Sequence, residues 1–147
     1  MPAIPSRCVV DTNVLISALL QPSGRTAQVL ETIQAQDGVV LFSDPTFQEL
    51  ATRLMRAKFD RYATVEIRDR YLADLAGVAE WVVIGGTLRA CRDPDDDKLL
   101  ETAVVGGADW LITGDDDLLI LEPFGSLRIV NPRSFLEVMA GGEGRVS

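Results

Sequence analysis

Five short apolar runs, separated by longer stretches of helical periodicity, constrain the fold of this 147-residue chain more than any other feature. The runs lie at residues 7–10, 39–43, 81–84, 110–113 and 128–130. Continuous apolar runs of this length are typical of parallel strands that are buried between two layers of helices. The sequence therefore predicts an α/β fold, a three-layer sandwich with a central, mostly parallel five-stranded sheet.

Helical patterns fill the intervals between these runs. Apolar residues recur at helical spacing in residues 14–19, 26–36, 47–54, 64–78 and 99–104, and in a last helix that runs through Met139. We expect Asp44 to cap the third of these helices, with Pro45 at its first helical position. The length suits one domain, predicted over residues 1–140, with residues 141–147 as a disordered tail.

Composition excludes several classes of protein. No apolar run approaches the length needed to span a bilayer, and the first residues lack the pattern of a signal peptide, so we expect a soluble cytoplasmic protein that does not bind membranes. The chain has no histidine, which excludes catalysis by a Ser-His-Asp triad or a histidine base. Its two cysteines, Cys8 and Cys91, form no CxxC pair, which argues against zinc and redox sites.

The net charge of −8 is concentrated in one part of the chain. Nine acids and a single base, Lys98, lie between Asp93 and Asp117, while the remaining residues carry 13 acids and 13 bases. From Arg53 to Arg70 the balance reverses, with six bases against three acids. The molecule is therefore predicted to have an acidic centre and a locally basic flank.

Acidic residues also follow three of the predicted strands. Asp11 comes directly after the first run, Asp115 comes shortly after the fourth, and residues 93–97 follow the third after a loop. The carboxyl ends of parallel strands meet at one edge of a sheet, where ligands of α/β proteins bind. Each position has a simpler explanation, since Asp11 and Asp93 can cap helices and residues 114–117 can form a solvated turn. A divalent-metal site explains all three together, because crowded carboxylates repel one another unless a cation neutralises them.

Glu49 is the least obvious candidate. It lies off the apolar stripe of its predicted helix, and Arg53 four residues later offers a surface ion pair worth about 0.3–0.5 kcal/mol. Periodicity alone therefore assigns it to the surface. Only its place in the first turns of the helix after the second strand makes it a candidate for the site.

Four segments of the chain, in order, resemble the motifs of PIN (PilT N-terminal) domain nucleases. They are residues 9–17 (VVDTNVLIS), 44–50 (DPTFQEL), 93–103 (DPDDDKLLETA) and 108–119 (ADWLITGDDDLL). The resemblance extends from about Cys8 to Pro132 and so covers nearly the whole chain. The long basic segment after Glu49 most resembles the bacterial group of toxin components of toxin–antitoxin pairs.

The resemblance implies a set of site residues. It implies Asp11, Glu49, Asp97 and Asp115 as the catalytic acids. Asp97 is preferred to Asp96 because it lies eighteen residues before Asp115, the spacing expected of the family. The metal ligands would be Asp11, Asp97 and Asp115, with Asp93 and Asp117 as auxiliary ligands. Asn13 and Thr113 would orient carboxylates or waters.

The resemblance also implies a function. PIN nucleases use Mg²⁺ or Mn²⁺ to cleave single-stranded RNA, leaving a 5′-phosphate and a 3′-hydroxyl. The basic flank, through Arg53, Arg56, Lys58 and Arg61, would hold the RNA backbone, although such residues are usually a solvated helix face. The expected partners are the RNA substrate, an antitoxin protein and a second copy of the chain in a homodimer.

Three other interpretations of the same residues remain open at this point. A haloacid-dehalogenase-like phosphatase is one, but Asn13 stands where the general acid of that family would be. A receiver domain is another, but residues 129–132 lack the lysine expected at the end of its fifth strand. A non-catalytic protein-binding module would use the acidic crevice to dock an arginine from a partner.

Overall fold

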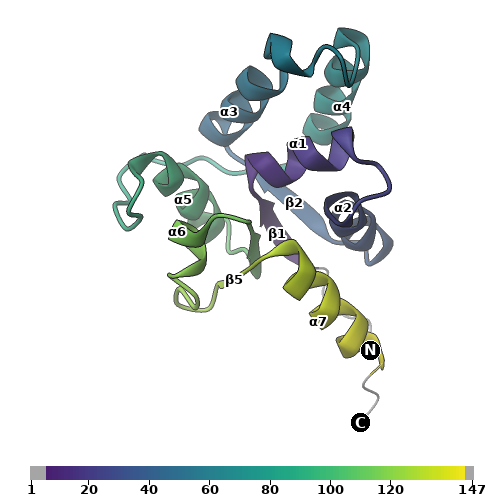
Figure 1. Ribbon diagram of the computed structural model, residues 1–147. Coiled ribbons are helices and arrows are strands. Elements are labelled where there is room, and N and C mark those ends of the chain that lie inside the picture. Colours follow the sequence, from purple (N-terminus) through teal and green to yellow (C-terminus); the bar gives the residue numbers. More distant parts are fainter. Residues whose placement is uncertain (1–5, 145–147) are drawn as a thin grey trace.

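The computed structural model describes residues 6–144 and contains one five-stranded sheet (Figure 1). Its strands are β1 (Arg7–Val10), β2 (Val39–Phe42), β3 (Glu80–Trp81), β4 (Trp110–Ile112) and β5 (Arg128–Val130). Their order is β3-β2-β1-β4-β5, and all neighbouring strands are parallel. The predicted fold class is therefore confirmed, with β1 at the centre of the sheet.

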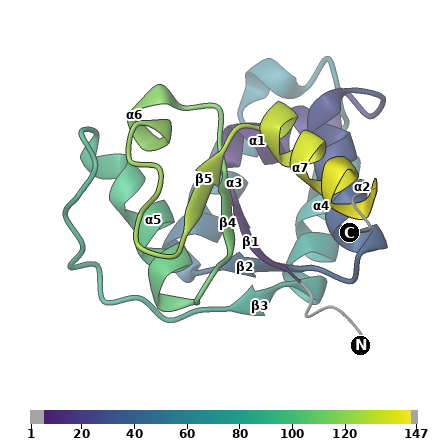
Figure 2. The ribbon, with the colours of Figure 1, turned by 90° about the horizontal axis from the view of Figure 1, so that it is seen from below.

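Helices cover both faces of this sheet. They are α1 (Thr12–Leu20), α2 (Arg25–Ala35), α3 (Asp44–Leu54), α4 (Val65–Val78), α5 (Asp97–Val105), α6 (Asp116–Leu119) and α7 (Pro132–Gly144). Figure 2 shows α5 and α6 on one side of the sheet, and α1, α2, α4 and α7 on the other. Successive side chains of β1 point to opposite faces of the sheet. Cys8 and Val10 pack with the larger group of helices, while Val9 packs against α5 and α6. This explains why residues 8–10 of the strand are all apolar.

The third strand is shorter and begins earlier than the predicted run at residues 81–84. Strand β2 ends at Phe42, so only Leu41 and Phe42 are available to pair with Glu80 and Trp81. The Val82 amide donates one further hydrogen bond to the Phe42 carbonyl (2.7 Å), after which the chain leaves the sheet. The length of β3 is thus set by the end of its neighbour rather than by its own apolar sequence.

Strand β2 ends at Phe42 because Ser43 begins the next helix. The Ser43 amide donates to the Thr46 hydroxyl (3.0 Å), and the Ser43 hydroxyl accepts from the Thr46 amide, so the two residues form a capping box. Ser43, rather than the predicted Asp44, is therefore the cap. Asp44 lies exposed within the first turn, and the Ser43 hydroxyl is buried against that of Thr102 in α5 (2.8 Å).

Two helices also differ from the sequence-based expectation. Residues 116–119 form α6 rather than a plain turn, because Asp115 caps them through its side chain. Helix α7 continues past Met139 to Gly144, so it includes the first part of the predicted tail, and residues 145–147 lie outside the described range. Among the described helices, none is long and apolar enough to cross a membrane.

Candidate functional site

A buried threonine joins two of the predicted acids at the carboxyl edge of the sheet. Asp11 follows β1, and its Oδ2 accepts a hydrogen bond from the Thr113 hydroxyl (2.6 Å) at the end of β4. The same hydroxyl oxygen accepts from the Asp115 amide (3.0 Å). Burial, with the charges of Glu49 and Asp115, raises the pKa of Asp11, although the Thr113 hydrogen bond opposes this shift. The structure thus brings Asp11, Thr113 and Asp115 together as the sequence predicted.

Asp96 is the third acid of this group, the acidic cluster of Asp11, Asp96 and Asp115. Burial, a carboxyl–carboxyl hydrogen bond with Asp115 and the charges of Asp115, Asp93 and Asp11 raise the pKa of Asp96 to about 7. Its Oδ2 is buried, and no hydrogen-bond donor within residues 6–144 contacts it. When Asp96 and Asp115 are both ionised, neither carboxylate has a proton to donate to the other. The negative charge on Asp96 Oδ2 is then not compensated by a hydrogen bond.

Asp97 does not join the acidic cluster, which corrects the sequence-based choice. Its Oδ1 accepts hydrogen bonds from the amides of Ala90 (3.0 Å) and Cys91 (2.8 Å), and the side chain is buried against that loop. These two bonds lower the pKa of Asp97. The short 3-10 turn at Pro94–Asp96 leads directly into α5, and it directs the carboxylates of Asp96 and Asp97 to different partners.

Glu101, one turn after Asp97 on α5, has the same structural role. Its carboxylate is buried and accepts from the amides of Gly85, Gly86 and Leu88 at 3.0–3.3 Å. Together the two acids hold the long segment that connects β3 to α5, which has no regular secondary structure up to Pro94. Two of the nine acids counted in the acidic centre therefore stabilise the backbone.

Glu49 lies next to the cluster, but its charge is already compensated. Its Oε1 contacts Lys98 Nζ (2.9 Å) and an Arg53 guanidinium nitrogen (3.2 Å), and its Oε2 accepts from the Thr12 hydroxyl (2.9 Å). The predicted ion pair with Arg53 is present. Sequence reasoning did not identify Lys98 and Thr12 as partners of Glu49, and through these contacts Glu49 joins α3 to α5 and α1.

The remaining predicted acids lie at the rim of the cluster. Asp93 is exposed, and its side chain accepts from the Asp95 amide (3.0 Å), while its charge acts on Asp96. Asp117 is half-buried on α6, and its amide donates to the Asp115 side chain (2.9 Å). Both predicted auxiliary ligands therefore lie near the cluster. Asp93 also has the cap role that the sequence offered as a simpler explanation, whereas the Asp11 side chain makes no cap hydrogen bond to α1.

A cavity of about 400 Å³ opens beside the cluster. Asp11 and Asp115 line it together with Asn13, Thr26 and Pro132. Asn13 is exposed, and within the described part of the chain it donates no hydrogen bond to a carboxylate. Its predicted orienting role is thus not visible, but its side chain borders the space in which a ligand of the cluster would lie.

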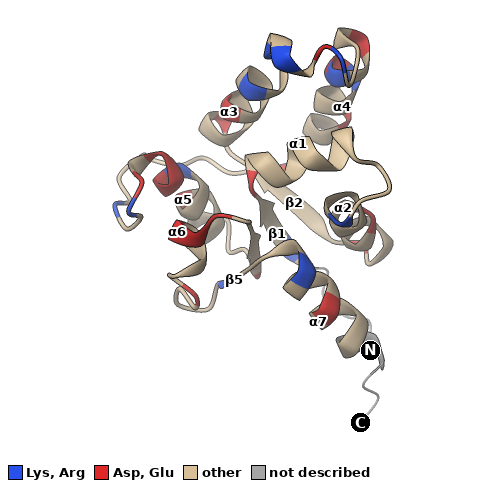
Figure 3. Cartoon of the chain, in the orientation of Figure 1, with Lys and Arg blue, Asp and Glu red and all other residues tan. Residues whose placement is uncertain are grey.

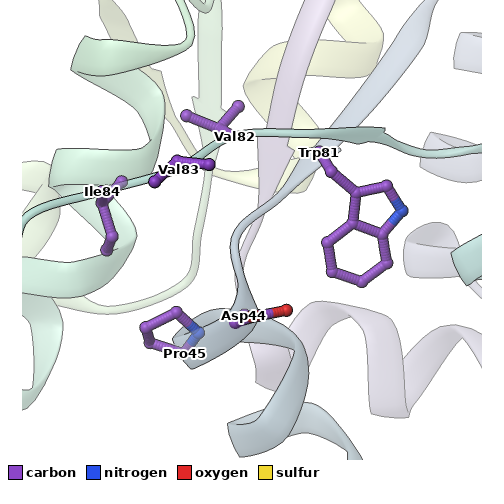
Figure 4. A pocket seen from close by; sticks show the side chains of 6 residues that line it. All are labelled: Asp44, Pro45, Trp81, Val82, Val83 and Ile84. Atoms are coloured by element: carbon purple, nitrogen blue, oxygen red, sulfur yellow. The ribbon is translucent and has the colours of Figure 1, made fainter.

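A separate cavity of about 330 Å³ lies beside the edge strand β3 (Figure 4). Asp44 and Pro45 line it from the start of α3, opposite the side chains of residues 81–84. Val83 is 92% exposed there. This cavity contains none of the predicted site residues, and apart from Asp44 its lining side chains lack charge.

The chemistry of the acidic cluster fits a hard divalent cation. All its donors are carboxylate oxygens, which Mg²⁺ and Mn²⁺ prefer, and one of them, Asp96 Oδ2, is buried without a hydrogen-bond partner among the described residues. Within residues 6–144, no three Asp, Glu or Cys side chains form a ready-made ligand set. Mg²⁺ is usually bound by one or two carboxylates and several waters, so a closed cage is not required.

The four predicted RNA-binding bases fall into two groups. Arg53, Arg56 and Lys58 line one small pocket at the end of α3, together with Asn13. Arg61 lies outside this pocket, with its guanidinium 5.8 Å from the centre of the Tyr62 ring. Arg68, another base of the flank, is fully buried and cannot contact a ligand at the surface.

Comparison with known proteins decides the family. A family model described as PIN domain matches residues 7–117, a range that includes the first three acidic motifs and every acid of the fourth. The chain belongs to the PIN domain family. It is also 29% identical to an uncharacterized protein, MJ1680, of Methanocaldococcus jannaschii, over 93% of this chain and 94% of that protein.

Two solved structures share the PIN fold of this chain. One is PAE2754 from Pyrobaculum aerophilum, with a TM-score of 0.58, 17% identity and coverage of 96% of this chain and 94% of that one. The other is VapBC2 from Rickettsia felis bound to a DNA fragment from their promoter, with a TM-score of 0.56, 14% identity and coverage of 85% and 98%. Membership of the PIN domain family supports a nuclease activity for this chain.

The opposite environments of Asp96 and Asp97 predict opposite effects on the stability of the metal-free PIN domain. Asp96 has a folded pKa of about 7 against an ordinary value of 3.8, so its protonation stabilises the fold and this contribution is lost as the pH rises towards 7. Asp96→Asn should therefore raise the melting temperature at about pH 8 in chelator and flatten its fall between about pH 5 and pH 8.

Asp97→Asn provides the matched control, because it removes one charge from the neighbouring residue. Its carboxylate accepts two backbone hydrogen bonds when ionised, so this variant should melt below the wild type throughout that range while its pH dependence is retained. Thermal denaturation of the three proteins measures both effects. Equal destabilisation by the two variants would contradict the assigned environments.

Proposed function

We propose that this PIN domain is a Mg²⁺- or Mn²⁺-dependent endoribonuclease that cleaves single-stranded RNA. The observation that carries the proposal is the acidic cluster at the carboxyl edge of the sheet, where Asp96 has a buried oxygen without a donor beside Asp115. Carboxylates in this arrangement repel one another and oppose folding, and a bound cation relieves that repulsion. The family supports the nuclease class, and the cluster supports the dependence on metal.

Asp11, Asp96 and Asp115 are the proposed metal ligands. Asp96 takes the place that the sequence gave to Asp97, whose carboxylate is engaged by the loop before α5. We propose that Asp93 and Asp117, at the rim of the cluster, contact waters of the ion. When bound, Mg²⁺ or Mn²⁺ supplies an activated water and neutralises charge on the phosphate oxygens.

The other residues of the site position groups for this reaction. The Thr113 hydroxyl donates to the Asp11 carboxylate and accepts from the Asp115 backbone amide. These two bonds hold Asp11 and Asp115 in place relative to one another. Glu49 orients the attacking water, while Lys98 and Arg53 offset its charge and hold it in place. The expected products carry a 5′-phosphate and a 3′-hydroxyl.

We further propose that the protein is the toxin of a toxin–antitoxin pair. This rests on the PIN family and on the shared fold with VapBC2, and it implies an antitoxin protein as partner. A homodimer in the cytoplasm is the expected state of the free protein.

Cleavage of RNA should depend on the cluster. Purified protein is expected to cleave single-stranded RNA when Mg²⁺ or Mn²⁺ is present. Cleavage should stop when chelator is added. Asp11→Asn and Asp96→Asn should each reduce kcat/KM by more than about 100-fold, because even outer partners of metal ligands contribute about 10- to 100-fold. Initial rates on a panel of labelled RNAs measure this effect.

Two variants serve as controls in that assay. Asp74→Asn changes an exposed acid on α4 and should leave the rate unchanged. Asp97→Asn, corrected for its folded fraction, should retain far more activity than Asp96→Asn. If wild-type cleavage persisted in Asp11→Asn, the mechanism would be wrong, and a non-catalytic role for the crevice would be favoured.

Glu49 should matter more for turnover than for metal binding. Its carboxylate is already engaged by Lys98, Arg53 and Thr12, so Glu49→Gln removes none of the proposed ligands of the ion. We expect this variant to lower kcat by about 10- to 1000-fold, the range of a lost water-orienting group, with Mn²⁺ affinity within about threefold of wild type. Titration calorimetry with Mn²⁺, beside single-turnover rates, separates the two quantities. A loss of Mn²⁺ affinity as large as that of Asp11→Asn would make Glu49 a ligand instead.

A further inference from the structure

We propose that one basic pocket binds a backbone phosphate of the RNA strand, next to the phosphate at which the strand is cleaved. This basic pocket is formed by Asn13, Ile16, Arg53, Arg56, Lys58 and Phe59. The pocket has a volume of about 160 Å³ and lies between α1 and the connection that follows α3. The inference rests on the proposed function, because it identifies how the same site would hold its substrate.

The cations of the pocket differ in how far they are neutralised. Arg53 forms an ion pair with Glu49, which neutralises part of its charge. Arg56 and Lys58 are exposed, and neither forms an ion pair within the described residues. The Lys58 ammonium lies 5.1 Å from the centre of the Phe59 ring, which forms part of the pocket wall. Two unpaired cations over one small concave surface suit a phosphate group, which arginine and lysine bind through charge-assisted hydrogen bonds.

Asn13 places this pocket next to the acidic cluster. Its side chain lines the basic pocket and also the cavity that contains Asp11 and Asp115. Figure 3 shows the same polarity at larger scale, with basic residues at the end of α3 and in its connection to α4, and acidic residues on α5 and α6. A strand that crosses α1 at Asn13 would place one phosphate at the cluster and a neighbouring phosphate among the cations.

A buried arginine fixes the segment that carries Arg56 and Lys58. Arg68 of α4 is fully buried, and its guanidinium donates to the carbonyls of Leu54 (3.0 Å) and Arg56 (3.3 Å). It also donates to Asp60 Oδ1 (2.5 Å) at the end of the 3-10 turn Ala57–Phe59. The backbone beneath the two cations is therefore held in place before any ligand binds, which reduces the entropic cost of binding.

Binding of RNA without cleavage tests this inference. In the Asp11→Asn background, with chelator present, the fluorescence anisotropy of a labelled single-stranded RNA of about ten nucleotides gives the affinity as a function of salt. The double substitution Arg56→Ala/Lys58→Ala should weaken binding by about tenfold or more at low salt. It should also reduce the slope of log affinity against log salt by about 0.7 for each phosphate that the variant no longer neutralises.

The matched control is Arg70→Ala/Arg128→Ala, which removes the same charge elsewhere. Arg70 is exposed on α4, and Arg128 begins β5 at the opposite edge of the sheet from the cluster. This variant should keep an affinity within about twofold of the background and nearly the same slope. Equal decreases in affinity for the two double variants would overturn the inference and leave only general charge attraction.

The cleavage assay separates this inference from the proposed function. If wild-type protein cleaves RNA but the two double variants bind alike, the pocket assignment fails while the nuclease assignment remains. If wild-type protein does not cleave RNA and only the pocket variant shows lower affinity and a smaller salt slope, the phosphate pocket stands and the nuclease assignment fails.

Discussion

The contact between the carboxyl groups of Asp96 and Asp115 is the constraint on which the site depends. Parallel strands β1 and β4 bring Asp11 and Asp115 to one edge of the sheet, and the turn before α5 brings Asp96 against them. Two ionised carboxylates in contact oppose folding, so the rest of the domain must offset their repulsion. Thr113 does so in part by donating to Asp11, while a buried oxygen of Asp96 has no donor in the described part of the chain. A cation that binds there would stabilise the folded state and prepare the site for phosphate chemistry.

Acids that are adjacent in the sequence have different roles in the structure. Asp93 caps the 3-10 turn, Asp96 points into the cluster, and Asp97 with Glu101 holds the loop that follows β3. The basic flank divides in a similar way, because Arg68 is buried and fixes the backbone while Arg56 and Lys58 remain exposed in the pocket. A count of charges therefore overstates how many of them face a ligand.

The sequence predicted the parallel sheet, the helices on both faces and the edge at which Asp11 and Asp115 meet, because these follow from apolar periodicity and chain order. It did not predict which residue of 95–97 joins them, since three adjacent aspartates in a short 3-10 turn show no periodicity that distinguishes one from the next. Spacing along the chain favoured Asp97, but amides of Ala90 and Cys91 engage its carboxylate, and these partners lie in a loop without a periodic pattern. Lys98 was likewise missed, because its contact with Glu49 joins two helices that are far apart in sequence.

The position of a bound ion is the most direct test of this account. Crystals grown with Mn²⁺ and measured at a wavelength where manganese scatters anomalously would locate the ion without reference to activity. We expect an anomalous peak in contact with carboxylate oxygens of Asp96 and Asp115, with Asp97 still bonded to the amides of Ala90 and Cys91. A peak coordinated by Asp97 with that loop displaced, or no peak at the edge of the sheet at saturating Mn²⁺, would contradict it.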